Sequence, residues 1–120
     1  MHLLVVDDEV DIRDLMAYWL RADGHHVIVA DSAASALAAV DEHGMPRAAV
    51  LDINMPGVDG IELWQLLRDR DPHLPALFAT AMWDSQILAR RGVTAGRHLP
   101  KPFTRSQLCT AVHNLTTSAH

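Results

Sequence analysis

The sequence predicts an α/β domain built on a doubly wound, parallel sheet of five strands. Short segments that are apolar at every position alternate five times with longer segments of helical period. Strands that are apolar throughout, instead of at alternate positions, are typical of a parallel sheet covered on both faces. Five such β–α repeats fill nearly all of the 120 residues, so we expect one domain at residues 1–120 and no second domain.

The predicted strands are short and consist mainly of valine, leucine and alanine. They comprise residues 3–6, 27–30, 48–51, 76–79 and, with the weakest pattern, 98–99. Right-handed connections between parallel strands place the intervening helices on both faces of the sheet.

The first two helices are predicted from apolar residues at helical spacing. From Ile12, apolar side chains recur at i+3, i+4, i+7 and i+8, and Gly24 is placed to end that helix. The second helix carries an apolar stripe over residues 33–40 and ends at Gly44.

The remaining three helices differ in the strength of their signals. Leucines mark a third helix over residues 63–67, which must end before Pro72. A fourth, at about residues 85–91, is short and poorly patterned. The fifth has an apolar face over residues 108–115, and the Thr-Arg-Ser-Gln sequence at 104–107 fits a capping box at its start.

Charge and hydropathy exclude two classes of partner. The formal net charge is −5, and Arg90–Arg91, the only adjacent basic pair, is interpreted as part of a solvated face, so we expect no direct contact with nucleic acid. No apolar run approaches the roughly 18 residues of a membrane span. Asp7 and Asp8 arrive too early for a signal peptide, so we expect a cytoplasmic protein.

Side chains suited to chemistry follow four of the five strands. Asp7 and Asp8 follow the first strand, Asp52 the third, Thr80 the fourth and Lys101 the fifth. In open parallel sheets, ligands bind outside the carboxyl ends of the strands. Each residue alone could be a polar loop residue, and Asp8 alone could cap the first helix. Their occurrence together at one rim predicts a functional site.

Four segments carry a family resemblance. They are Val-Val-Asp-Asp-Glu at 5–9, Leu-Asp-Ile-Asn-Met-Pro-Gly-Val-Asp-Gly at 51–60, Ala-Thr-Ala at 79–81 and Lys-Pro-Phe at 101–103. Asp-Asp alone is a weak signal, whereas Asp-x-x-Met-Pro-x-x-Asp-Gly joined to a distant Lys-Pro-Phe is a strong one. On these segments, the sequence resembles the response-regulator receiver domains of two-component signalling across essentially its whole length.

The resemblance implies a flavodoxin-like strand order, 2-1-3-4-5. Strands one and three are neighbours in that order, so Asp7, Asp8 and Asp52 would crowd together. Two carboxylates about 4 Å apart repel by roughly 4 kcal/mol at an effective dielectric near 20. A divalent cation relieves that repulsion, and hard oxygen ligands with room for water favour Mg²⁺, or Mn²⁺ in its place. Because Mg²⁺ often shares its ligand shell with phosphate, the pattern points to phosphoryl transfer.

The resemblance also implies a role for each acidic residue. Asp52 is implied to be the phosphoacceptor, which takes a phosphoryl group from a sensor histidine kinase or a histidine phosphotransfer protein. The implied metal ligands are Asp7, Asp8, Asp52 and the backbone carbonyl of Asn54. We therefore expect a signalling domain that assists its own phosphorylation and dephosphorylation, and not an enzyme.

Thr80 and Lys101 are implied to close on the phosphoryl group, one as a hydroxyl donor and the other as a point charge. The Lys101–Pro102 peptide bond is implied to be cis, as in the family. A phosphoryl group adds about −1.5 to −2 charges and three acceptor oxygens, so it favours the closed arrangement. The face around helix four, strand five and helix five would change with it and alter binding of an unknown downstream protein.

His98 departs from the family pattern. It stands three residues before Lys101, where the family usually has Tyr or Phe as a rotamer switch. One hypothesis is that His98 swings as the aromatic residue does, but with a titratable ring. The alternative is an inert histidine at the rim.

Three other functions use the same fold or the same acidic residue. The first is an interaction module that works without phosphorylation, although the intact site residues argue against it. The second is a Mg²⁺-dependent aspartyl phosphohydrolase, which needs a carboxylate two residues after its nucleophile, where this chain has Asn54. The third is a flavin-binding flavodoxin, whose phosphate loop the acidic run at residues 7–9 would repel.

Overall fold

The computed structural model describes residues 1–80, 85–93 and 97–117. Strands and helices alternate along the chain, and every strand and helix predicted from the sequence is present. The strands are β1 (His2–Val6), β2 (His26–Ala30), β3 (Ala48–Leu51), β4 (Ala76–Thr80) and β5 (His98–Pro100). The helices are α1 (Val10–Ala22), α2 (Ala33–His43), α3 (Gly60–Arg70), α4 (Ser85–Arg90) and α5 (Arg105–Thr117).

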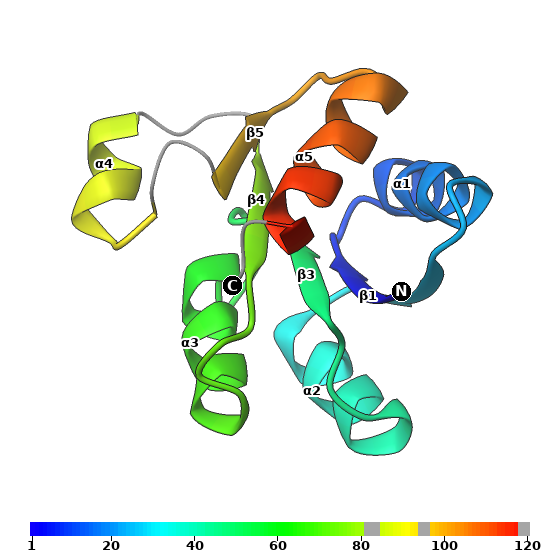
Figure 1. Cartoon of the computed structure of the whole chain (residues 1–120). Helices are drawn as coiled ribbons and strands as arrows, with labels where there is room; N and C mark the ends of the chain where they lie inside the picture. Colours follow the sequence, from blue (N-terminus) through cyan, green and yellow to red (C-terminus); the bar gives the residue numbers. More distant parts are fainter. Residues whose placement is uncertain (81–84, 94–96, 118–120) are drawn as a thin grey trace.

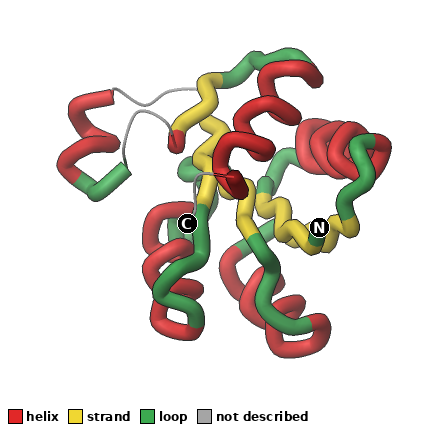
Figure 2. The backbone as a smooth tube through the Cα atoms, viewed as in Figure 1, coloured by secondary structure: helices red, strands yellow, loops and turns green. Residues whose placement is uncertain are grey.

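The strands form one parallel sheet in the order β2-β1-β3-β4-β5, which confirms the predicted topology. β1 lies between β2 and β3, and Val6 pairs with Ala30 on one side and with Leu51 on the other. Figure 2 shows the strands in the middle of the molecule with helices around them. The carboxyl ends of β1, β2 and β3 are therefore level with one another.

Two apolar layers cover the sheet, one on each face. Leu4 and Val6 of β1 pack toward α2 and α3, whereas Leu3 and Val5 pack toward α1 and α5. The same division is visible in Figure 1, where α1 and α5 lie on one side of the sheet and α2 and α3 on the other. This alternation explains why the strands are apolar at every position.

The ends of the helices follow the sequence signals. At the start of α5, the Gln107 amide donates to Thr104 Oγ1 (3.1 Å) and the Thr104 amide donates to Gln107 Oε1 (2.8 Å), which confirms the predicted capping box. Gly24 and Gly44, just after α1 and α2, have φ values of +94° and +88°, which residues with a Cβ rarely adopt. Within the described residues, no helix is long and apolar enough to cross a membrane.

Candidate functional site

The carboxyl ends of β1 and β3 bring two of the predicted acidic residues side by side. Val6 pairs with Leu51, and the next residues are Asp7 and Asp52. The Asp52 amide donates to the Val6 carbonyl (2.9 Å), and the Asp7 amide donates to the Ala30 carbonyl (3.1 Å). The sheet ladder thus continues one residue beyond each strand and fixes both backbones.

Asp7, Asp8 and Asp52 form a carboxylate cluster at this rim. One oxygen from each lies within 4.8 Å of the other two. Asp7 is fully buried and Asp52 is 3% exposed, whereas Asp8 is exposed. Three hard oxygen donors with one side open to water fit Mg²⁺, which keeps several waters when it binds to proteins.

Asp8 does not cap α1, so the capping interpretation is wrong. The N-cap residue is Glu9, and its side chain makes no capping hydrogen bond. The Glu9 amide instead donates to Asp7 Oδ1 (2.9 Å), which orients that carboxylate. The Asp8 side chain is therefore available to the cluster.

Lys101 places its ammonium group among the carboxylates. Its Nζ donates to Asp7 Oδ2 (2.8 Å) and lies 3.6 Å from Asp52 Oδ2 and 3.5 Å from Glu9 Oε1. The side chain is only 9% exposed. The Lys101–Pro102 peptide bond is cis, as predicted. The structure thus joins the end of β5 to the ends of β1 and β3.

Burial and charge shift the pKa values of Asp52 and Lys101. Burial, reinforced by the negative charge of Asp7, raises the pKa of Asp52 to about 6, although Lys101 and the Asn54 amide oppose this rise. Burial disfavours the ammonium form of Lys101, but the hydrogen bond to Asp7 and the charges of Asp7 and Asp52 outweigh it and raise the pKa of Lys101. Lys101 therefore stays charged, and one cation faces several acidic groups.

The loop after β3 is tied to the first turn of α3. The Asn54 amide donates to Asp52 Oδ1 (3.2 Å), and the Gly60 amide donates to the Ile53 carbonyl (3.2 Å). A Cβ atom at Gly60 would lie 2.1 Å from the carbonyl oxygen of Asp52. Because only glycine allows this approach, α3 begins directly against the backbone of Asp52.

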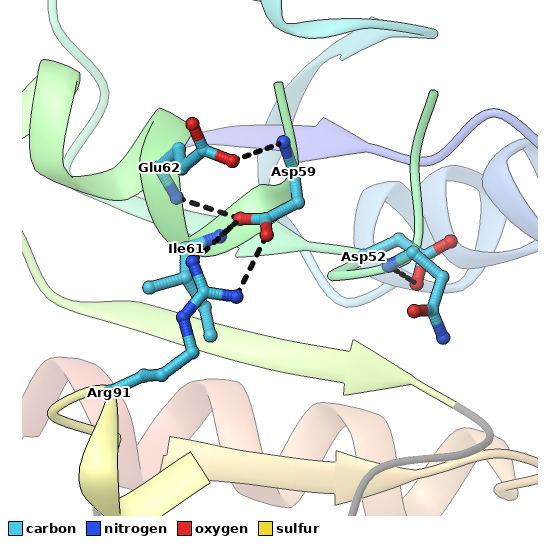
Figure 3. A network of polar contacts seen from close by, with 6 residues as sticks. Asp52, Asp59, Ile61, Glu62 and Arg91 are labelled. Carbon is cyan, nitrogen blue, oxygen red and sulfur yellow. Dashed lines mark hydrogen bonds and ion pairs between the residues drawn. The ribbon is translucent and has the colours of Figure 1, made fainter. Parts of the chain in front are cut away.

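Asp59 holds the first turn of α3 in a capping box. Its Oδ1 accepts hydrogen bonds from the Ile61 and Glu62 amides, both at 2.9 Å, and the Asp59 amide donates to Glu62 Oε1 at 3.5 Å. Figure 3 shows these contacts beside Asp52. The Asp-Gly pair of the sequence motif thus forms the start of α3.

Arg91, just after α4, makes an ion pair with the same carboxylate. Its Nη1 lies 2.8 Å from Asp59 Oδ2, and its Nη2 lies 3.4 Å from Oδ1 (Figure 3). Burial acts to raise the pKa of Asp59, but the hydrogen bonds from Arg91 and from the Glu62 and Ile61 amides outweigh it and lower that pKa. The interpretation of Arg91 as a solvated surface residue is therefore wrong. The ion pair was not foreseen because Asp59 lies 32 residues away in the sequence.

Two predicted residues remain outside this network. The backbone of Thr80 ends β4, but its side chain lies outside the described residues, so its contact with a phosphoryl group stays a prediction. His98 begins β5 opposite Phe78 and is half-buried. Its Nε2 is buried and has no hydrogen-bond partner among the described residues, and burial lowers the pKa of the imidazole.

Two grooves near the site had no signal in the sequence. One, of about 420 Å³, lies between α1 and the loop after β5, and its lining includes Ile12, Trp19, Lys101 and Phe103. The other, of about 480 Å³, lies between His98 and polar residues of α5. Both depend on which helix faces meet the loop after β5, and short-range patterns carry no information on that.

The comparisons with known proteins agree with this geometry. The sequence matches the model of the response regulator receiver domain over residues 3–113, and the chain belongs to that family. It is therefore a receiver domain of the two-component response-regulator type and acts in signal transduction. This membership favours none of the phosphorylation-independent, phosphohydrolase or flavin-binding alternatives.

Two regulators and one solved structure illustrate the relationship. The chain is 36% identical to the transcriptional regulatory protein TrcR of Mycobacterium tuberculosis over 117 residues, which are 96% of this chain and 45% of TrcR. It is 37% identical to the response regulator FleR of Pseudomonas aeruginosa over 103 residues, 84% of this chain and 21% of FleR. The NtrX receiver domain of Brucella abortus is 35% identical with a TM-score of 0.84, covering 97% of this chain and 98% of that one.

Proposed function

We propose that Asp52 accepts a phosphoryl group from the phosphohistidine of a sensor histidine kinase or of a histidine phosphotransfer protein, in a reaction that requires Mg²⁺. The observation that carries this proposal is the position of Asp52. It is a buried carboxylate at the carboxyl rim of the sheet, grouped with Asp7 and Asp8 and 3.6 Å from the ammonium group of Lys101. Family membership over residues 3–113 supports the same reaction.

The transfer forms one bond and breaks one. Oδ2 of Asp52 attacks phosphorus, the P–N bond breaks, the electron pair returns to the imidazole nitrogen, and an acyl phosphate remains. We assign Oδ2 as nucleophile because Oδ1 accepts the Asn54 amide hydrogen bond, whereas Oδ2 faces Lys101. With a pKa of about 6, Asp52 is mostly ionised at neutral pH and can act as a nucleophile.

The carboxylate cluster is the proposed metal site. Asp7, Asp8, Asp52 and the backbone carbonyl of Asn54 would hold Mg²⁺, or Mn²⁺ in its place. The bound ion would supply positive charge to the phosphoryl oxygens as negative charge gathers there. Lys101 needs only a small movement from Asp7 Oδ2 toward Asp52 Oδ2 to contact those oxygens, since it already lies 2.8 Å and 3.6 Å from the two.

The groove beside Lys101 supports a protein as the phosphoryl donor. Its apolar lining lies on α1 and the loop after β5, directly beside the site. Leu15, which lines the groove, is 42% exposed, and Tyr18, three residues further along α1, is 66% exposed, so the two add exposed apolar surface on the same face of the helix. We assign this surface to the donor domain that carries the phosphohistidine, and we propose that the reaction occurs in the cytoplasm.

The proposed output is a change of the face formed by α4, β5 and α5. Closure of Thr80 and Lys101 on the phosphoryl group would favour one of two arrangements of that face, and an unknown downstream protein would bind that arrangement better. His98, with a buried Nε2 that has no described partner, is proposed to change rotamer with it. On this proposal residues 1–120 act as a phosphoacceptor and not as an enzyme with a separate substrate.

The phosphoacceptor is tested by intact mass after incubation with acetyl phosphate and Mg²⁺. Wild type should gain one phosphoryl group, Asp52→Asn should gain none, and chelation with EDTA should abolish the gain. Asp14→Asn, which removes an exposed carboxylate of α1, is the matched control and should be labelled as wild type is. Labelling of Asp52→Asn, or no labelling of folded wild type, would contradict the proposal, and the latter would favour a phosphorylation-independent module.

The metal site is tested by thermal unfolding with and without Mg²⁺. Because a ligand that binds only the folded state stabilises it, Mg²⁺ should raise the Tm of wild type. The free energy of unfolding should rise by about 1.4 kcal/mol for each tenfold excess of Mg²⁺ over its Kd. Asp8→Asn should need more Mg²⁺ for the same rise, since Asp8 supplies one of the three grouped oxygens. An equal response in Asp8→Asn and wild type would exclude Asp8 as a ligand.

A further inference from the structure

A third groove lies at the opposite rim of the sheet from Asp52. It has a volume of about 410 Å³ and lies between α3, the loop before β4 and the residues after α4. Its lining includes Ala76, the first residue of β4, whereas Asp52 follows the last residue of β3. Since the strands are parallel, this groove, which we call the α3 cleft, is separate from the carboxylate cluster.

The α3 cleft is basic in an acidic chain. The chain has 15 acidic and 10 basic residues, with a net charge of −5. Yet among the described residues that line the cleft, the ionisable ones are Arg68, His73 and Arg97, and none is a carboxylate. Such a local reversal of charge favours an anionic ligand.

Arg97 gives independent support for an external anion. Its side chain is half-buried, and it makes no ion pair with any residue in the described part of the chain. Fully buried cations need an anionic partner, and the half-buried Arg97 can contribute its guanidinium to an anion that enters the cleft. In contrast, Arg70 and Arg91 are paired with Asp41 and Asp59.

The wall of the cleft is aromatic and fixed. Trp64 donates from Nε1 to the Leu74 carbonyl (3.4 Å), and its ring meets Phe78 at 5.5 Å and 80°, an edge-to-face arrangement. The Arg68 guanidinium lies 4.7 Å from the centre of the Trp64 ring. These contacts hold the indole and one guanidinium in place before any ligand arrives.

We propose that the α3 cleft binds a nucleotide, with its phosphate on Arg68 and Arg97 and its base against the half-buried indole of Trp64. A guanidinium presents a fork of N–H donors that matches phosphate oxygens, and aromatic side chains stack on bases. The volume lies within the range of about 300–1,000 Å³ of small-molecule sites. The guanidinium groups of Arg68 and Arg97 beside the indole of Trp64 fit a small molecule that carries both an anion and a ring. They fit the spaced carboxylates of an acidic peptide less well.

The proposal is tested by NMR titration of the whole ¹⁵N-labelled chain with AMP, in EDTA so that no metal brings phosphate to Asp52. The indole N–H of Trp64, assigned from Trp64→Phe, should shift together with the backbone amide of Arg97. Adenosine, which lacks the phosphate, and ribose 5-phosphate, which lacks the base, should each bind at least about tenfold more weakly than AMP.

Three variants locate the site. Arg68→Gln and Arg97→Gln should each weaken AMP binding by about tenfold or more while their other resonances remain those of the folded protein. Arg70→Gln, in the same helix but paired with Asp41, is the matched control and should bind as wild type does. The proposal is overturned if millimolar AMP leaves Trp64 unshifted, if Arg70→Gln weakens binding equally, or if hexaglutamate peptide binds in the cleft and AMP does not.

Discussion

Helices α4 and α5 both flank the end of the sheet that carries β4 and β5, but they are held in different ways. α5 has 13 residues and buries Leu108, Val112 and Leu115 on one stripe against the sheet. α4 has 6 residues, and among its described side chains Leu88 alone is buried. α5 is thus packed along its length, whereas the described side chains of α4, at residues 88–90, contribute one buried residue.

Among the described residues, two apolar side chains and one ion pair attach α4 and the turn that follows it. Leu88 and Val93 enter the layer beneath α2 and α3, and between them Arg91 holds Asp59. Segments with few buried apolar contacts open locally at a lower free energy than the core. We therefore predict that α4, with 6 residues against the 13 of α5, opens at a lower free energy than α5 and the sheet.

The largest expected difference is between two leucine truncations. Leu108→Ala should lower the free energy of unfolding by about 2–5 kcal/mol, because it leaves a cavity under α5. Leu88→Ala should lower the free energy of unfolding by less than about half of the loss in Leu108→Ala. The loss in Leu88→Ala cannot exceed the free energy with which α4 docks onto the rest of the domain. Urea unfolding followed by circular dichroism measures both. Equal losses would mean that α4 is as firmly packed as α5.

Removing the charge of Asp52 should separate global from local opening. A folded-state pKa of about 6, against about 3.8 unfolded, means that the folded protein binds the proton more tightly. The free energy of unfolding therefore falls as pH rises from about 4 to 6, by about 3 kcal/mol in all. Without Mg²⁺, Asp52→Asn should be more stable than wild type by up to about that amount at pH 8, and the difference should shrink toward pH 4.

Hydrogen exchange shows where that stabilisation acts. Amides of α5 should become more protected in Asp52→Asn, because they exchange through global unfolding. Amides of α4 should not change, because they exchange through local opening. Increased protection in both helices would show that α4 opens only with the whole domain.

The smallest expected effect concerns the ion pair that holds α4. Arg91→Gln should cost about 0.5–1 kcal/mol of docking free energy and speed exchange of the α4 amides about two- to fivefold, with α5 unchanged. Arg90→Gln is the neighbouring control. Because the folded-state pKa of Asp59 is lowered, the ion pair contributes above about pH 4, and the two proteins should converge as pH falls below that value. The same acceleration of exchange in Arg90→Gln would show that the effect does not come from the Arg91–Asp59 ion pair.

The strands and helices could be predicted from local signals, and the acidic cluster from those signals together with the family resemblance. Continuous apolar runs predicted the strands, and the Thr104–Gln107 spacing predicted a cap that the structure contains. Strand ends in a parallel sheet share one rim, and the strand order implied by the family resemblance makes strands one and three neighbours, so Asp52 was expected near Asp7. These inferences need only the period of the pattern and the topology of the sheet.

Contacts between elements far apart in the sequence could not be predicted in the same way. The Arg91–Asp59 pair joins residues 32 positions apart, and an Arg-Arg dipeptide does not reveal whether either side chain has a partner. The α3 cleft likewise depends on how the residues after α4 approach Trp64. To predict the surroundings of His98, one would also have to know which face of α5 lies next to it. Each of these three features depends on distances between elements, and the periodicity of the sequence does not determine those distances.

The contact between Gly60 and Asp52 limits how this chain can diverge. A side chain at position 60 would meet the carbonyl oxygen and carbon of Asp52 at 2.1 Å and 2.8 Å and the Cα of Ile53 at 3.1 Å, all of them backbone atoms. No rotamer change elsewhere relieves a clash with backbone, so random mutagenesis at this position should return glycine alone. Position 59 has more freedom, since serine or asparagine can also cap a helix. Of two adjacent residues in one motif, one is therefore interchangeable with similar residues and the other is not.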